Sequence, residues 1–220
     1  MDNATADRLV TVVLDKRPTV VLIAGPGCVG KSYFATQIAE RLDQRGLLAT
    51  DFGLDGFLFD RAIRLNRGWI TAHNPLAYDL ARAAEILRTL VAKRVSQAIP
   101  LLDKKLSRSV GYRLIEPAEC YLIEGTVAFH LSVENIPTLR VFIDADRETQ
   151  FNNRYARERI EVGYTRKESI ARFESYWRDY LQYLVPDRER ADLLIDVDHE
   201  YRGRISCPNE EADTPHLEED

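Results

Sequence analysis

Short apolar runs alternate with longer amphipathic segments along most of the chain. The apolar runs predict buried strands at residues 20–24, 47–50, 120–125, 139–144 and 191–197. Apolar residues at helical spacing predict helices at residues 4–14, 31–45, 78–96, 147–160 and 166–184. Because strands alternate with helices, the pattern predicts an α/β fold in which a parallel sheet carries helices on both faces.

The last predicted helix has six apolar or aromatic residues on one face. We expect this face to be buried: Ile170, Phe173, Trp177, Tyr180, Leu181 and Leu184. Sites in open parallel sheets form at the carboxyl ends of the strands. The candidate chemistry of this chain is expected there, because each motif described below follows a predicted strand.

Composition describes an ordinary globular chain. Of 220 residues, 45% are apolar and 30% are charged, and the formal net charge is −5. The acidic balance argues against a dedicated nucleic-acid-binding protein. No apolar run reaches the roughly 18 residues of a membrane span, and neither a signal peptide nor a disulfide framework is visible. We therefore expect a cytoplasmic protein that binds neither membranes nor nucleic acids.

The length suits one domain, which we assign to residues 1–207. Residues 208–220 carry six acidic residues and no basic ones, so they are expected to form a frayed tail.

The segment GPGCVGKS fits the phosphate-binding pattern G-x-x-x-x-G-K-[ST] and has the required context of a strand before it and a helix after it. Small residues let successive backbone N–H groups face one anion, and the helix N-terminus adds a partial positive charge. This P-loop refines the fold class to a P-loop NTPase three-layer fold. We assign ATP binding to Gly25, Pro26, Gly27, Cys28, Val29, Gly30, Lys31, Ser32 and Tyr33. Cys28 is interpreted as a small filler side chain.

Two residues of this loop have further roles in the pattern. Lys31 can reach the β- and γ-phosphates, and the Ser32 hydroxyl can bind Mg²⁺. Lys31 is therefore a candidate catalytic residue, and Ser32 is a candidate metal ligand.

Asp55 follows the second predicted strand and is the candidate catalytic base. A carboxylate there can take the proton of an attacking hydroxyl. The alternative is that Asp55 caps a helix or turn. Asp51 and Asp60 compete for the same role.

Glu124 ends the apolar run CYLIE and precedes Gly125. A carboxylate at the end of a buried strand must be paired or bound to a metal. Glu124 is therefore a candidate Mg²⁺ site residue, with a salt bridge to Lys31 or an arginine as a compatible alternative.

Residues 147–172 carry seven basic and four acidic residues, a local excess in an acidic chain. Arg154 and Arg157 share a helix face, and guanidinium groups can stabilise the charge of a transferred phosphoryl group. The alternative is a solvated helix on which Glu158 pairs with one of them. Arg61, Arg64 and Arg67 could similarly meet an anionic acceptor or form an exposed helix edge.

The chain resembles the uridine kinase and phosphoribulokinase superfamily over roughly residues 18–197. The resemblance rests on GPGCVGKS, LDGFLFD, NPLAYD, YLIEGTVAF, VFIDAD and VPDRERADLLID, which occur in the expected order. Members are cytosolic P-loop kinases that phosphorylate a hydroxyl of a nucleoside, a sugar or pantothenate. The resemblance implies ATP and Mg²⁺ at the P-loop, Asp55 as the base, Glu124 near the metal, and Arg154 and Arg157 in a mobile lid at about 147–168.

Candidate acceptor contacts are Asp55, Phe57, His73, Tyr78, Asp103 and Glu124. The chain departs from uridine kinases at several of these places. His73 replaces the ribose-binding aspartate, and Leu102 replaces the tyrosine that precedes Asp103. Val162 and Tyr164 stand where nucleoside contacts would be arginines. A pocket that loses such polar groups usually serves another substrate. The His73 side chain is either an acceptor contact or a turn residue without a role.

These features predict an ATP-dependent kinase that phosphorylates a hydroxyl of a nucleoside-like or other small metabolite. A pantothenate- or sugar-type kinase is the alternative within the superfamily. A nucleotide-binding switch without acceptor chemistry is the alternative outside it, although no guanine-selecting motif is visible. Association into a homo-oligomer is left open.

Overall fold

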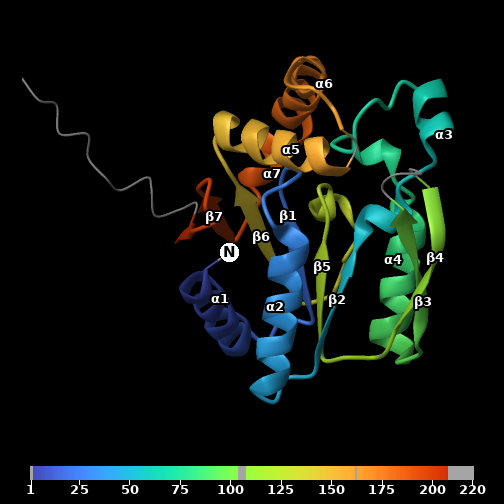
Figure 1. Cartoon of the computed structure of the whole chain (residues 1–220). Coiled ribbons are helices and arrows are strands. Elements are labelled where there is room, and N and C mark those ends of the chain that lie inside the picture. The colour runs from blue at the N-terminus through green and yellow to red at the C-terminus, as the bar shows by residue number, and fades with distance from the viewer. Residues whose placement is uncertain (1, 104–107, 162, 208–220) are drawn as a thin grey trace, which may run out of the picture.

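The computed structural model describes residues 2–103, 108–161 and 163–207 (Figure 1). Its main sheet has six strands in the order β2-β5-β1-β6-β7-β8. They are β1 Val20–Ala24, β2 Ala49–Gly53, β5 Cys120–Glu124, β6 Thr138–Asp144, β7 Leu193–Val197 and β8 Gly203–Ser206. The first five strands in this order pair in parallel, whereas β8 is antiparallel to β7. The acidic tail predicted at 208–220 lies outside the described residues.

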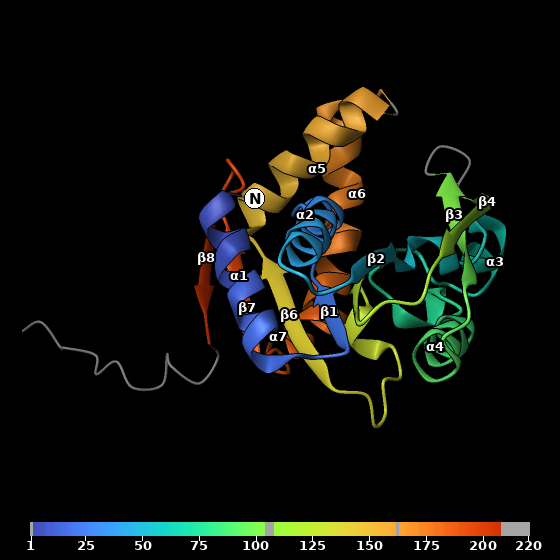
Figure 2. The ribbon, with the colours of Figure 1, turned by 90° about the horizontal axis from the view of Figure 1, so that it is seen from below.

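Helices cover both faces of the sheet, as predicted. Helices α1 (Asn3–Lys16) and α2 (Lys31–Gln44) lie side by side on one face (Figure 2). Helix α4 (Leu80–Arg88) and the segment 180–188 cover the other face. Alternate residues of β1 enter the two cores: Val21 packs with α1 and α2, and Leu22 packs on the opposite side. All five residues of β1 are buried, which is typical of a central parallel strand.

The carboxyl ends of the parallel strands meet at one edge of this sandwich. Helices α5 (Arg147–Glu161) and α6 (Arg166–Asp179) lie above that edge, and the short helix α3 (Arg61–Asn66) lies beside them (Figure 1). β5 pairs with one side of β1 and β6 pairs with the other. The loop after β1 is therefore at the point where the strand order reverses, which is where such sheets bind ligands.

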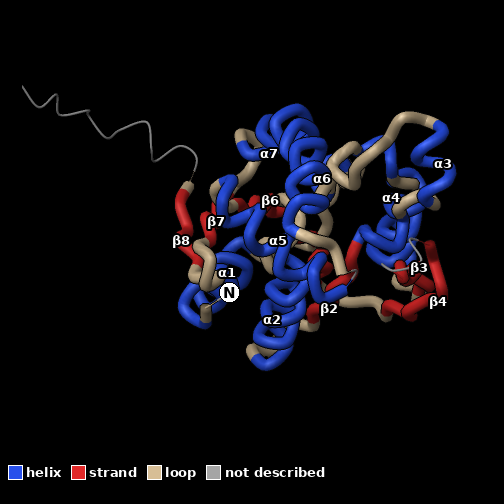
Figure 3. Tube along the Cα trace, turned by 45° about the horizontal axis from the view of Figure 1, so that its top comes forward, coloured by secondary structure: helices blue, strands red, loops and turns tan. Residues whose placement is uncertain are grey.

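A two-stranded antiparallel sheet, β3 (Gln97–Asp103) with β4 (Arg108–Ile115), was not predicted. It lies at the opposite side of the molecule from β7 and β8 (Figure 3). The 3₁₀ turn η1 (Leu54–Phe57) packs against β3 at Gly56. A Cβ at Gly56 would lie 1.7 Å from the Pro100 carbonyl oxygen, so only glycine permits this approach.

Several predicted bounds were wrong. The second strand is Ala49–Gly53 and not 47–50, so the predicted strand ended too early. The helix predicted at 78–96 ends at Arg88 and continues as a π-helical turn, η3 (Thr89–Lys93), before the left-handed Arg94.

The helix predicted at 166–184 also ends early, at Asp179, and is followed by a π-helical turn, η5 (Tyr180–Leu184). A π turn inserts extra residues and shifts the buried face. Tyr180 and Leu184 are buried, but Ile170 and Leu181 are 46% and 52% exposed. No described helix combines the length and apolar character needed to cross a bilayer.

Candidate active site

The P-loop connects β1 to α2 and lines a cavity of about 1160 Å³ at the carboxyl edge of the sheet. Gly25 has a φ of +139°, and a Cβ there would lie 1.9 Å from the Ile143 carbonyl oxygen. The loop therefore leaves β1 in close contact with β6. Gly30 has a φ of +87° and is the N-cap of α2. Both positions require glycine, which explains the spacing of the motif.

Most of the predicted ATP-binding residues line this cavity: Gly27, Cys28, Gly30, Lys31, Ser32 and Tyr33. Val29 is instead buried in the core beneath α2, and Pro26 and Gly25 contribute backbone to the loop without lining the cavity. The assignment of Val29 to the ATP-binding loop stays a prediction that concerns its backbone, because its side chain lies in the core. An apolar residue suits this position because it anchors the start of α2.

Lys31 is buried beneath the P-loop, with 7% of its surface exposed. Its Nζ donates a hydrogen bond of 2.7 Å to the Pro26 carbonyl oxygen, and an ammonium group has three N–H donors. Burial lowers the pKa of Lys31, while the charges of Glu124 and Asp55 act in the opposite direction. An ammonium group that is desolvated in this way favours an anionic ligand.

Ser32 and Glu124 are joined directly. Ser32 Oγ, in the first turn of α2, donates a hydrogen bond of 2.9 Å to Glu124 Oε1 at the end of β5. A Cβ at Gly53 would lie 2.6 Å from the same carboxylate oxygen, so the end of β2 leaves room for it. A hydroxyl and a carboxylate side by side are oxygen ligands of the kind that Mg²⁺ binds.

Asp55 lies on η1 and lines the cavity together with Lys31 and Glu124. Asp51 and Asp60, the alternative candidates for the catalytic base, do not line the cavity. Asp51 lies within β2, accepts a hydrogen bond of 3.3 Å from Thr36 Oγ1 and pairs with Arg113 at 3.7 Å. Asp60 is exposed at the start of α3. Since β2, β5 and β1 are neighbours, their ends bring Asp55, Glu124 and the P-loop together.

His73 lines the cavity wall and is 4% exposed. Its Nδ1 lies 2.9 Å from the Tyr176 carbonyl oxygen, and its backbone N–H donates to Thr71 Oγ1. Thr71 Oγ1 in turn donates to Asp179, so the 71–73 segment is fixed to α6. Burial lowers the pKa of His73 to about 3. The imidazole is therefore neutral at physiological pH.

Three other predicted acceptor contacts do not line the cavity. Phe57 is 3% exposed and belongs to the main core. Tyr78 is 5% exposed, bridges Leu58 through the backbone, and donates from its hydroxyl to the Ala72 carbonyl oxygen at 3.0 Å. Asp103 lies at the end of β3, and its neighbour Leu102 is the residue that lines the cavity. The two aromatic side chains fill apolar clusters beneath the site. The acceptor contacts assigned to these three residues stay predictions.

Arg154 and Arg157 of α5 both line the cavity. Arg154 is 9% exposed, pairs with Glu158 at 2.8 Å, and its guanidinium carbon lies 3.3 Å from the Tyr176 ring centroid. Arg157 pairs with Glu161 at 3.7 Å. The ion pair with Glu158 expected as an alternative is present, but it is buried at the site and not solvated. Residue 162, one of the departures from uridine kinases, lies outside the described residues.

Among the cavity residues that were not predicted, two form hydrogen bonds to the P-loop. Asn153 Nδ2 and Tyr201 Oη donate to the Cys28 carbonyl oxygen at 3.4 and 3.3 Å. Tyr201 lies in the turn between β7 and β8, and its ring would contact a Cβ at Gly30 at 3.4 Å. The sequence pattern predicts 191–197 as the last strand. It gives no sign that the chain after this strand returns toward the P-loop.

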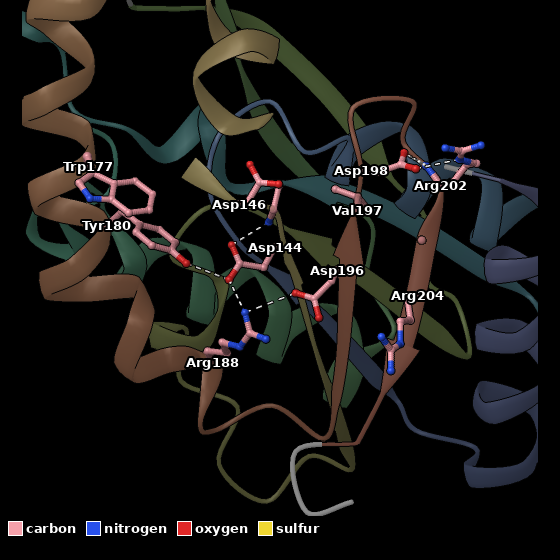
Figure 4. A pocket seen from close by; sticks show the side chains of 12 residues that line it. Asp144, Asp146, Trp177, Tyr180, Arg188, Asp196, Val197, Asp198, Arg202 and Arg204 are labelled. Atoms are coloured by element: carbon pink, nitrogen blue, oxygen red, sulfur yellow. Dashed lines mark hydrogen bonds and ion pairs between the residues drawn. The ribbon is translucent and has the colours of Figure 1, made fainter. Parts of the chain in front are cut away.

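A second cavity, of about 720 Å³, lies between the ends of β6 and β7 and shares no lining residue with the first (Figure 4). Its centre is Asp144, which is 2% exposed. Asp144 Oδ2 accepts hydrogen bonds of 2.8 Å from Tyr180 Oη and Arg188 Nη1. Arg188 also pairs with Asp196 at 3.4 Å. This network fixes the segment 180–188 to the sheet.

The first cavity combines a P-loop, a hydroxyl–carboxylate pair and arginines above the strand ends. The sequence profile of the Phosphoribulokinase / Uridine kinase family matches residues 20–201. The chain belongs to this family. As a phosphoribulokinase/uridine kinase family protein, it is a P-loop kinase, and its mostly parallel sheet with flanking helices has the fold of that family's solved members.

Individual relatives agree with the family assignment. This chain is 25% identical over 187 residues to a uridine kinase of Halalkalibacterium halodurans. The match covers 83% of this chain and 87% of that protein. It is 23% identical to the uridine/cytidine kinase UKL1 of Arabidopsis thaliana, where the match covers 82% of this chain but 38% of that protein. D-glycerate 3-kinase from Cryptococcus neoformans shares the fold, with a TM-score of 0.70 at 14% identity over 94% of this chain and 100% of that one.

Proposed function

We propose that this protein transfers the γ-phosphoryl group of ATP to a hydroxyl of a small metabolite. One observation carries the proposal: Asp55, Lys31, Ser32 and Glu124 converge on one cavity from three neighbouring strand ends. A hydrolase or switch needs only the phosphate-binding part of this set. A kinase needs in addition a carboxylate beside the cradle and space for an acceptor, and the cavity of about 1160 Å³ offers both.

The loop fits the polyphosphate of a nucleotide. The glycines at 25 and 30 give the backbone the curvature of an anion cradle, and Lys31 is a buried ammonium at its centre. Ser32 Oγ and Glu124 fit Mg²⁺ by their chemistry, because this ion prefers one or two protein oxygens together with phosphate oxygens. When bound, Mg²⁺ would neutralise part of the negative charge of the phosphates.

The side chains of this protein position the acceptor hydroxyl and stabilise the charge of the transferred phosphoryl group. Asp55 accepts the proton of the acceptor hydroxyl as the hydroxyl oxygen forms its bond to the γ-phosphorus. The bond from that phosphorus to the β–γ bridging oxygen breaks, and ADP leaves with the electron pair. Lys31, Arg154 and Arg157 stabilise the charge spread over the transferred oxygens. The neutral His73 lines the acceptor side of the cavity without adding charge.

The proposal is tested by ADP release in the presence and absence of hydroxyl compounds. The panel contains nucleosides, pantothenate, sugars and hydroxy acids, with Lys31→Ala as the background. We expect one class of acceptor to accelerate ADP release by the wild-type protein and to have no effect on Lys31→Ala. Slow release that is the same with every compound would contradict the kinase assignment and favour a nucleotide switch.

The names of the relatives suggest where to look for the acceptor. Uridine kinases are its curated relatives, and a D-glycerate 3-kinase shares its fold. The nucleoside contacts are altered at His73 and Leu102, and both residues line the cavity. These changes favour an acceptor outside the nucleosides.

A further inference from the structure

Among the described residues, six basic side chains and five carboxylates line the cavity. Four of its carboxylates have a basic or hydroxyl partner. Glu158 pairs with Arg154 at 2.8 Å, Glu161 with Arg157 at 3.7 Å, Glu200 with Arg202 at 2.9 Å, and Glu124 accepts from Ser32. The fifth, Asp55, lies close enough to Lys31 for its charge to offset part of the lowering of the lysine pKa that burial causes.

Three further arginines line the same cavity: Arg61, Arg64 and Arg172. Within residues 2–103, 108–161 and 163–207, none of the three is in an ion pair with a carboxylate. These three guanidinium groups therefore line the cavity without an ion-pair partner among the described residues.

Arg64 is the best fixed of these residues. It is only 9% exposed although it belongs to a short helix at the edge of the molecule. Its Nε donates a hydrogen bond of 2.9 Å to the Phe59 carbonyl oxygen, which holds the guanidinium group at the cavity wall. A buried guanidinium group without a carboxylate partner is costly unless an anion binds it.

Arg172 enters from α6, on another wall of the cavity. Its guanidinium carbon lies 4.8 Å from the Tyr164 ring centroid, and its buried Nε has no hydrogen-bond partner among the described residues. The ring fixes the plane of the guanidinium group, and a planar guanidinium suits carboxylate and phosphate oxygens.

Arg64 comes from a different element than the nucleotide cradle. It lies on α3, which follows Asp55 along the chain and precedes His73. The cavity residues around it are mostly apolar: Leu58, Leu65, Ile70 and Ala72. This wall offers few groups for the polar edges of a nucleobase, but it suits a short aliphatic body that carries one anionic group.

We infer that the hydroxyl acceptor of this kinase is anionic, and that Arg64 and Arg172, with Arg61, bind its carboxylate or phosphate group while Asp55 faces its hydroxyl. This inference rests on the proposed function and narrows its substrate class. Carboxylate and phosphate acceptors share the same recognition chemistry, and the experiment distinguishes them.

The experiment measures ADP release with pairs of compounds that differ in the anionic group. The pairs are D-glycerate and glycerol, pantothenate and pantothenol, and ribulose 5-phosphate and ribulose, with uridine as a neutral nucleoside. We expect the charged member of at least one pair to exceed its neutral partner in kcat/KM by on the order of 10- to 100-fold, which corresponds to the loss of a hydrogen bond to a charged group. If the larger ratio of kcat/KM occurs in a carboxylate pair, the anionic group is a carboxylate. If it occurs in the phosphate pair, the group is a phosphate.

Variants locate the binding site. Arg64→Met and Arg172→Met should each raise KM for the charged acceptor by on the order of 10- to 100-fold and leave the Kd of ATP unchanged. Arg67→Met is the matched control, because Arg67 lies on Trp69 and does not line the cavity. The unchanged Kd of ATP shows that each variant is folded, and Arg172→Met tests the inference independently if Arg64→Met fails to fold.

Two results would overturn the inference and are distinguishable. If uridine or another neutral compound drives ADP release and the arginine variants do not change it, the acceptor is neutral and the kinase assignment stands. If no compound accelerates release, the proposed function fails together with the inference.

Discussion

Ser32 Oγ donates a hydrogen bond of 2.9 Å to Glu124 Oε1, which joins the first turn of α2 to the end of β5. The two residues are 92 positions apart in the chain. Their contact exists because β5 is the parallel neighbour of β1, so that the P-loop and the end of β5 share one edge of the sheet. Both side chains present oxygen at the place where the phosphates of ATP are proposed to bind.

Glu124→Gln tests the metal role of this pair. The amide keeps the size of the side chain but removes the negative charge, so we expect the Mg²⁺ concentration needed for half-maximal activity to rise about 10- to 100-fold. The measurement is a Mg²⁺ titration of ADP release at fixed ATP. Glu134→Gln, at an exposed position outside the cavity, is the control. An unchanged Mg²⁺ requirement in Glu124→Gln would remove this residue from the metal site.

Arg154→Met tests the buried ion pair with Glu158. It leaves a carboxylate that is 5% exposed with the Ser169 hydroxyl but no basic partner, so we expect the free energy of unfolding to fall by about 3 kcal/mol. The double variant Arg154→Met/Glu158→Gln should recover part of this loss because it removes the uncompensated charge. Urea unfolding measures the free energy of unfolding of the wild type, the single variant and the double variant.

The pair of Arg157 with Glu161 is the matched control for that cycle. It lies one turn along α5, its side chains are 39% and 40% exposed, and its separation is 3.7 Å. Arg157→Met should change the free energy of unfolding by about 1 kcal/mol or less, as for surface pairs. Equal losses in the two arginine variants would contradict the distinction between a buried and an exposed pair.

The sequence predicted the parts of the site that depend on local pattern. The P-loop is specified by its own glycines. Asp55 was found in the loop after an apolar run, and Glu124 at the end of one. The sequence does not show that Phe57 and Tyr78 lie off the cavity wall, because neighbours of site residues can point either into a cavity or into the core. Here Phe57 and Tyr78 enter apolar clusters.

Long-range pairing explains what could not be predicted. Tyr201 reaches the P-loop only because β8 returns antiparallel to β7, and no local signal marks that return. The hairpin of β3 and β4 contains Pro100 and exposed apolar residues such as Tyr112, which obscure an alternating pattern. The π turn at 180–184 could not be predicted for a similar reason, since it depends on the packing beneath it.

His73 gives the stability of the protein a specific pH dependence. Its pKa is about 3 in the folded protein and near the ordinary 6.5 when unfolded, so the unfolded state binds a proton more readily. The contribution of His73 to the free energy of unfolding is therefore lost as the pH falls below 6.5 toward 3. Between about pH 7.5 and 5.5, the wild type should lose about 1.4 kcal/mol through this residue.

The variant His73→Gln should lack this component. The difference in unfolding free energy between wild type and His73→Gln is therefore expected to shrink by about 1.4 kcal/mol between these two pH values. His199→Gln, at an exposed position, should show no such change. A difference between wild type and His73→Gln that does not depend on pH would mean that the imidazole is protonated equally in both states.

The most direct test of the account compares Asp55→Asn with Asp60→Asn. Asp55 lines the cavity beside Lys31, whereas Asp60 lies five residues further on and is exposed. With the acceptor that drives ADP release, we expect Asp55→Asn to bind ATP as the wild type does and to lose at least ~10²-fold in turnover, the range for lost general-base assistance. Asp60→Asn should retain wild-type turnover. Full turnover in Asp55→Asn would contradict the claim that this carboxylate prepares the acceptor hydroxyl.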